Sequence, residues 1–109
     1  MEVKESPIDG IGLFATVSYK KGKKIYDYEG TEIFWRDYLG DYRNTYSLKR
    51  VHKIIVGSAN NPCKYLNTSP EANVILKKRA LYALRDIDVG EEMVLKGYFR
   101  DYPKLTSVA

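Results

Sequence analysis

Asn67-Thr68-Ser69-Pro70-Glu71-Ala72-Asn73 is the most informative segment of the chain, because it holds two asparagines in one short loop. An amphipathic strand pattern follows this loop, then an acidic turn at Gly90-Glu91-Glu92, and then a tyrosine, Tyr98. Asparagine is common in turns because its side chain bonds the nearby backbone, so each piece alone is a weak signal. The ordered set is far more specific than any one of its parts.

The bulk composition predicts a single globular domain. The chain has 109 residues, of which 44% are hydrophobic and 29% are charged. This length fits one core, and this balance is not that of a disordered chain. No apolar run approaches the roughly 20 residues of a membrane helix, and residues 1–5 lack the apolar segment of a secretion signal. We expect an intracellular protein without membrane contact, nuclear or chromatin-associated in a eukaryote or virus and cytoplasmic in a prokaryote.

One cysteine, Cys63, and one histidine, His52, limit the chemistry that the chain can perform. A single cysteine allows no internal disulfide, and a structural zinc site normally needs four such ligands, so we expect no metal. Cys63 is predicted to be a small buried residue beside the asparagine loop, because a nucleophilic cysteine would need a base partner. His52 is predicted to lie on a strand away from the motifs, in a structural role.

The formal net charge of +4 and the pI of about 9.1 would suit acidic partners, including nucleic acid. The two basic runs, at 20–24 and 77–79, coincide with predicted turns and lack the interleaved aromatics of a single-strand binding groove. We therefore expect solvated turns and no direct nucleic-acid contact. A basic nucleic-acid-binding β-domain is kept as the less favoured alternative.

Short segments that alternate with turn residues predict a mainly β fold with little helix. Strands are expected at 13–17, 24–28, 31–34, 52–56, 80–84 and 92–95. Helix is confined to a turn or two within 35–39 and one short helix at 61–66, with Asn61 as N-cap and Pro62 at the first helical position.

From about Ser6 to Tyr102 the sequence resembles a minimal SET domain, the fold of many protein-lysine methyltransferases. The matching segments, in order, are Gly10-Ile11-Gly12-Leu13-Phe14-Ala15, Lys21-Gly22, Tyr28-Glu29-Gly30, Tyr46-Ser47-Leu48, Ile54-Ile55-Val56, Asn60-Asn61, 64–73 and 83–92. The resemblance implies a single SET domain over 1–109, with the match over 6–102 and a flexible tail at 103–109. It also implies several short β-sheets and a C-terminal pseudoknot.

Three features depart from the family pattern. Thr68 replaces the histidine of the family's Asn-His pair, and the cysteine and proline that follow it are also replaced. Gly97 occupies the position that simple spacing assigns to the catalytic tyrosine, so Tyr98 comes one residue late, and a bulge at 96–97 would restore the register. The cysteine-rich tail that closes the substrate channel in larger relatives is missing. A homodimer is therefore expected as one way to close that channel.

The resemblance implies transfer of a methyl group from S-adenosylmethionine to a lysine amine of a protein substrate, with a histone or histone-like tail as the expected substrate. The implied cofactor-binding residues are Gly10, Ile11, Gly12, Leu13, Tyr46, Asn67 and Thr68, and the implied channel residues are Tyr28, Tyr98 and Tyr102. Tyr98 is the candidate catalytic residue, in a role of orientation and electrostatics, since a phenol with a pKa near 10 is mostly protonated at neutral pH.

Two other functions remain open at this level. A catalytically degenerate SET domain could act as a protein-binding module, as the replacement at Thr68 and the insertion of Gly97 suggest. The nucleic-acid-binding β-domain is the second. The number of methyl groups transferred is not predicted, because the position that tunes it lies just before the catalytic tyrosine, where the register shifts.

Overall fold

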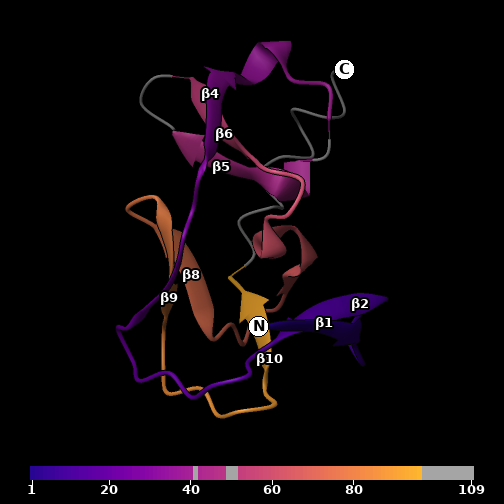
Figure 1. Ribbon diagram of the computed structural model, residues 1–109, viewed down its shortest axis with the longest axis vertical. Coiled ribbons are helices and arrows are strands. Elements are labelled where there is room, and N and C mark those ends of the chain that lie inside the picture. The colour runs from indigo at the N-terminus through magenta and orange to yellow at the C-terminus, as the bar shows by residue number, and fades with distance from the viewer. Residues whose placement is uncertain (41, 49–51, 97–109) are drawn as a thin grey trace.

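The computed structural model describes residues 1–40, 42–48 and 52–96 (Figure 1). Tyr98, Tyr102 and the bulge expected at Gly97 lie outside the described residues. Within the described ranges, regular structure consists of short strands and of 3-10 helices of three or four residues, as the mainly β prediction requires.

The larger sheet combines the two ends of the described chain. Its spatial order is β1 (Glu2–Glu5), β2 (Ile11–Phe14), β10 (Glu92–Leu95), β8 (Val74–Lys77), β9 (Ala80–Ala83) and β3 (Lys24–Asp27), and β7 (Asn67–Thr68) also pairs with β10. The order differs from the sequence order because β10, the last described strand, is inserted next to β2. Figure 1 shows these strands in the lower part of the molecule, curled around one another.

The smaller sheet has the order β4 (Gly30–Phe34), β6 (Lys53–Gly57) and β5 (Thr45–Leu48), all antiparallel. It forms the upper part of the molecule in Figure 1. The described helices are η1 (Trp35–Asp37), η2 (Tyr42–Asn44) and η4 (Pro62–Tyr65). The predicted cap of η4 is confirmed, since the Asn61 side chain accepts from the Cys63 N–H at 3.1 Å and Pro62 is the first helical residue.

Strand β10 holds three distant segments together. It pairs antiparallel with β2 through Met93 and Leu13, and parallel with β7 through Val94 and Asn67. Leu95 lies opposite Val74 of β8 as well. The glycine pair (Gly10 and Gly12), the asparagine loop (67–73) and the acidic turn (90–92) therefore meet at one strand, which is the described part of the predicted pseudoknot.

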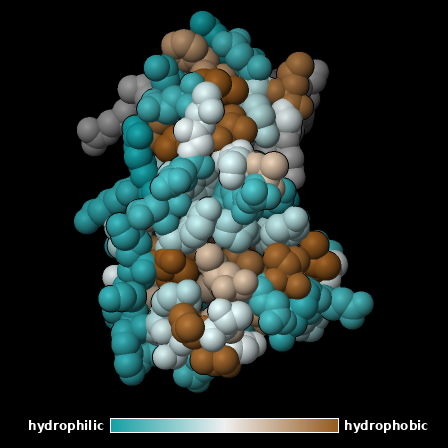
Figure 2. Space-filling view, viewed as in Figure 1, coloured by the Kyte–Doolittle hydropathy of each residue, from teal (hydrophilic) through white to brown (hydrophobic). Residues whose placement is uncertain are grey.

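The hydrophobic core lies under this junction. Leu13, Met93 and Leu95 are fully buried, because alternate residues of adjacent strands point to the same face of the sheet. The buried cluster consists of Leu13, Ala15, Tyr28, Tyr46, Ile55, Cys63, Leu66, Val74, Leu81, Ala83, Ile87, Met93 and Leu95. Figure 2 shows a mostly hydrophilic face with scattered apolar groups. No helix of the described residues is both long and apolar enough to cross a membrane.

Three expectations about strands are corrected. The strand expected at 13–17 runs from Ile11 to Phe14, because Ala15 bonds instead to the acidic turn through Glu91 and Gly90. His52 precedes its strand, since it has the left-handed φ of 55° and pairing begins at Lys53. Strand β1 was not expected, because its residues are mostly polar and all are exposed, and it exists through pairing with β2.

The turn between β8 and β9 is strained. Lys78 and Arg79 have φ values of 50° and 58°, which non-glycine residues rarely adopt. The N–H of Arg79 donates to the Tyr46 hydroxyl at 2.8 Å, and its carbonyl accepts from the Tyr28 N–H at 2.9 Å. These two tyrosines from other parts of the fold therefore hold the turn in place.

Candidate functional site

The Asn67 side chain is the centre of the candidate site. It is only 4% exposed, and its Nδ2 lies 3.0–3.1 Å from four acceptors. These acceptors are the Ser6 hydroxyl, the carbonyls of Asp9 and Ile11, and the Glu92 carboxylate. The asparagine loop is thus in direct contact with the glycine-pair segment, which precedes it by more than fifty residues.

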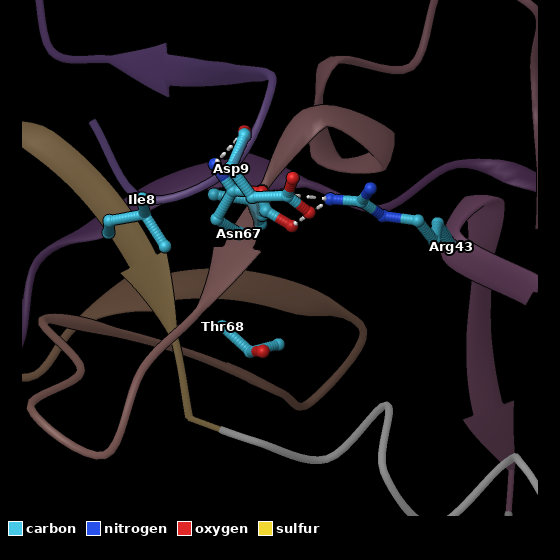
Figure 3. A pocket seen from close by; sticks show the side chains of 6 residues that line it. Ile8, Asp9, Arg43, Asn67 and Thr68 are labelled. Atoms are coloured by element: carbon cyan, nitrogen blue, oxygen red, sulfur yellow. Dashed lines mark hydrogen bonds between the residues drawn. The ribbon is translucent and has the colours of Figure 1, made fainter. Parts of the chain in front are cut away.

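Arg43 approaches Asn67 from the opposite side (Figure 3). Its Nη2 donates to the Leu66 carbonyl at 2.8 Å and to the Asn67 Oδ1 at 3.3 Å. Because a guanidinium only donates and carbonyls only accept, these neighbours require the amide nitrogen to face the glycine-pair segment and the oxygen to face Arg43. The direction of the Asn67 amide therefore follows from the chemistry of its surroundings.

A cavity of about 310 Å³ opens beside this amide. It is lined by Ile8, Asp9, Arg43, Leu66, Asn67 and Thr68. Figure 3 shows Ile8 and Arg43 at opposite ends with Asn67 between them. The cavity thus offers an apolar side chain, an oxygen acceptor and a cation within one space.

The two glycines of the first motif serve different purposes. Gly10 has a φ of 46°, a left-handed conformation that favours glycine. At Gly12 a Cβ would overlap the Glu92 carboxylate. The sequence predicts that these glycines let the backbone approach a ligand closely. The structure adds a second reason at Gly12, which is to leave room for the Glu92 side chain.

The other residues of the first motif differ in exposure. Ile11 is half exposed beside the site, whereas Leu13 is fully buried and lies between Val3 and Met93 in the sheet. Thr68 lines the cavity and pairs with Leu95, so β10 leads from the site toward the segment that contains Tyr98. The cofactor roles of these residues stay predictions.

Tyr28 and Tyr46 lie together in the core. Their ring centroids are 5.5 Å apart at an interplanar angle of 48°. Among the described residues, the lining of the Asn67 cavity does not include either ring, and the Tyr46 hydroxyl accepts from Arg79. The role of Tyr46 in binding the cofactor and the role of Tyr28 in the lysine channel stay predictions.

Replacing Tyr46 by phenylalanine is expected to lower the free energy of unfolding by about 1 kcal/mol, because the Arg79 N–H loses its acceptor. Guanidinium denaturation followed by circular dichroism measures this change. Tyr65→Phe is the control, since Tyr65 is a partly buried ring that packs against the core. A Tyr46→Phe variant as stable as the wild type would show that the hydroxyl contributes nothing to the turn.

Cys63 is 1% exposed, and burial raises its pKa to about 12. Because the thiolate is the reactive form, the folded protein should resist a disulfide reagent at pH 8 and react only when unfolded. Timed labelling with and without guanidinium tests this expectation. Rapid labelling of the folded chain would contradict the burial of Cys63.

Among the described residues no group of three or more His, Cys, Asp or Glu side chains could hold a metal ion.

Arg43, Asp9 and Ile8 line the site but were not anticipated from the sequence. Arg43 belongs to a short 3-10 helix before β5, and its sequence neighbourhood carries no motif. Ile8 and Asp9 immediately precede the glycine pair, and this proximity in sequence is the signal from which their place in the site could have been predicted.

No protein-family model and no curated protein matches this sequence. Solved structures do match. A candidate histone methyltransferase of Plasmodium falciparum superposes with a TM-score of 0.72 at 16% identity, covering 88% of this chain and 90% of that one. The methyltransferase domain of human PR domain-containing protein 2 superposes with a TM-score of 0.62 at 22% identity, and the match covers 86% of this chain and 74% of that one.

A third match is the Polycomb Repressive Complex 2 structure ctPRC2, which is bound to S-adenosylmethionine. It gives a TM-score of 0.69 at 22% identity and covers 89% of this chain but 15% of that one. The chain has the SET-domain fold. The resemblance read from the motifs is confirmed at the level of fold, and at these identities the fold is what the structures share. In this fold, the cavity is lined by Ile8 and Asp9 just before the glycine pair, by Arg43, and by Leu66 and the first two residues of the asparagine loop.

Proposed function

We propose that this SET domain is an S-adenosylmethionine-dependent methyltransferase that modifies a lysine side-chain amine of a protein substrate. The observation that carries the proposal is the paired chemistry of the cavity, an amide oxygen on Asn67 beside the guanidinium of Arg43. Its volume of about 310 Å³ is at the small end of ligand pockets, so it fits part of the cofactor.

The amino-acid end of S-adenosylmethionine is a zwitterion, and the cavity suits both of its charges. The Asn67 Oδ1 would accept from the ammonium group, and the Arg43 guanidinium would pair with the carboxylate. Charge-assisted hydrogen bonds of this kind are roughly twice as strong as neutral ones. Ile8, which is half exposed at the cavity, would cover apolar parts of the ligand.

When bound, the cofactor supplies a methyl group on a positively charged sulfur. The attacking lysine must be neutral, although its ordinary pKa is about 10.4, and desolvation among aromatic rings lowers that pKa. Tyr98, Tyr102 and Tyr28 are the proposed rings, and Tyr98 would orient the amine. Two residues, Lys96 and Gly97, separate Leu95 from Tyr98, so chain connectivity keeps the two Cα atoms within about 11 Å.

A histone or histone-like tail is the proposed substrate class. Support comes from the Plasmodium protein, which is described as a candidate histone methyltransferase. We also propose that a homodimer closes the substrate channel. Light scattering after size-exclusion chromatography tests the dimer, and a monomer at all concentrations would remove it.

The experiment that tests the function has two steps. Calorimetry with S-adenosylmethionine should show binding by the wild type and weaker, still measurable binding by Asn67→Ala. Radiolabelled cofactor should then transfer methyl groups to histones or basic peptides. Binding without transfer would favour the degenerate binding module, as the replacement at Thr68 would suggest. No cofactor binding, with salt-dependent affinity for nucleic acid, would favour the basic β-domain.

A further inference from the structure

We propose that Ser6 and Glu92 are positioning residues that fix the direction of the Asn67 amide, so that its oxygen faces the cavity. This inference rests on the proposed function, because the amide oxygen is the group offered to the cofactor ammonium. Neither residue lines the cavity among those that the structure describes, so both act through Asn67.

The hydroxyl of Ser6 links the network. It lies 2.8 and 2.9 Å from the two carboxylate oxygens of Glu92, to which it donates its one proton. It accepts from the Asn67 Nδ2 at 3.1 Å and from the Ile8 N–H at 3.0 Å. The single proton of the hydroxyl is therefore used, and one of its acceptor positions is taken by the Ile8 N–H. The two protons of the Asn67 amide are shared among four acceptors, of which the Ser6 hydroxyl is one.

The carboxylate of Glu92 completes the arrangement. Its Oε2 accepts from the Asn67 Nδ2 at 3.0 Å. An ionised carboxylate is acceptor-only, so it cannot bond to the Asn67 oxygen if the amide turns over. A turned amide would also place its oxygen against the Asp9 and Ile11 carbonyls, which likewise only accept.

Gly12 explains how the carboxylate reaches this position. A Cβ there would overlap the Glu92 carboxylate and would lie 3.1 Å from the Ser6 Cβ. The absence of a side chain at Gly12 therefore leaves the space that the carboxylate occupies. The positioning network thus depends on three segments, 6–12, the asparagine loop and the acidic turn.

The neutral variant Glu92→Gln breaks the pattern without a large change in size. If the glutamine NH₂ faces the Asn67 NH₂, a donor lies against a donor. If it faces the Ser6 hydroxyl, that hydroxyl keeps one acceptor oxygen in place of two, and the negative charge beside the Asn67 NH₂ is lost in either case. Ser6→Ala removes the hydroxyl link and is the milder change.

The test compares two ligands that differ only at the end that Asn67 would contact. S-adenosylhomocysteine carries the amino-acid end, and 5′-methylthioadenosine lacks it. For Ser6→Ala and Glu92→Gln, calorimetry should show an affinity for S-adenosylhomocysteine lowered about tenfold, consistent with loss of one charge-assisted hydrogen bond. The affinity for 5′-methylthioadenosine should be unchanged. Ser58→Ala and Glu2→Gln, at exposed sites, are the matched controls.

A double-mutant cycle tests whether Ser6 acts through Asn67 or affects ligand binding independently of it. In an Asn67→Ala background, Ser6→Ala should have no further effect on the ratio of the two affinities, because the group through which it acts is gone. Equal losses for both ligands, or an undiminished effect in the Asn67→Ala background, would overturn the positioning role. Failure of the wild type to bind S-adenosylhomocysteine would instead overturn the proposed function, and this inference with it.

Discussion

Replacing Asn73 by alanine is expected to lower the free energy of unfolding by about 3 kcal/mol. Asn73 is 1% exposed, and its Oδ1 accepts from the Val94 N–H at 2.8 Å. Its Nδ2 donates to the Glu92 carbonyl at 2.8 Å. Alanine leaves two main-chain groups of β10 without these partners, and each unsatisfied buried group costs about 1–3 kcal/mol.

Guanidinium denaturation followed by circular dichroism measures the effect of Asn73→Ala. Asn60→Ala is the matched control, because Asn60 is an exposed turn residue, and exposed substitutions change stability by about 0.5 kcal/mol or less. Point mutants typically lose about 1 kcal/mol of stability. A loss below about 1 kcal/mol for Asn73→Ala would therefore show that β10 does not depend on this side chain.

Replacing Arg43 by alanine is expected to lower the affinity for S-adenosylhomocysteine about 20-fold. Arg43 contributes the cation of the cavity and donates to the Leu66 carbonyl and the Asn67 Oδ1. Hydrogen bonds to charged groups contribute about 1.5–3 kcal/mol, and because Arg43 is exposed we expect a value near the lower limit. Isothermal titration calorimetry at low and high salt measures the change.

Two controls accompany Arg43→Ala. Arg43→Lys keeps the charge but loses the fork geometry, so it should recover only part of the affinity. Arg36→Ala removes an exposed cation that stacks on Phe34, in the smaller sheet, and should leave the affinity unchanged. Equal affinity in Arg43→Ala and wild type would remove Arg43 from the proposed site.

Local rules predicted much of the fold from the sequence. The cap at Asn61, the turn at Gly22 and the strand at 92–95 depend on neighbouring residues, and all three occur in the structure. The order of the motifs predicted the SET-domain fold. His52 was misplaced because an apolar run after it extended the strand pattern by one residue, and β1 was missed because polar residues give no strand signal.

The site was predicted less completely because its partners are distant in sequence. The Asn67 loop and the glycine pair were found through motifs, and the structure joins them through the Asn67 Nδ2. Arg43 and Ser6 reach the site through tertiary contacts of more than 20 and 60 residues in separation, which no local pattern encodes. Tyr46 was assigned by resemblance, whereas its hydroxyl bonds a strained turn in this fold.

A crystal structure of the full chain with S-adenosylhomocysteine would show whether the Asn67 cavity holds the amino-acid end of the cofactor. We expect the ligand ammonium within hydrogen-bond distance of the Asn67 Oδ1 and the carboxylate beside Arg43. A ligand bound elsewhere on the protein, with the Asn67 cavity empty, would contradict it.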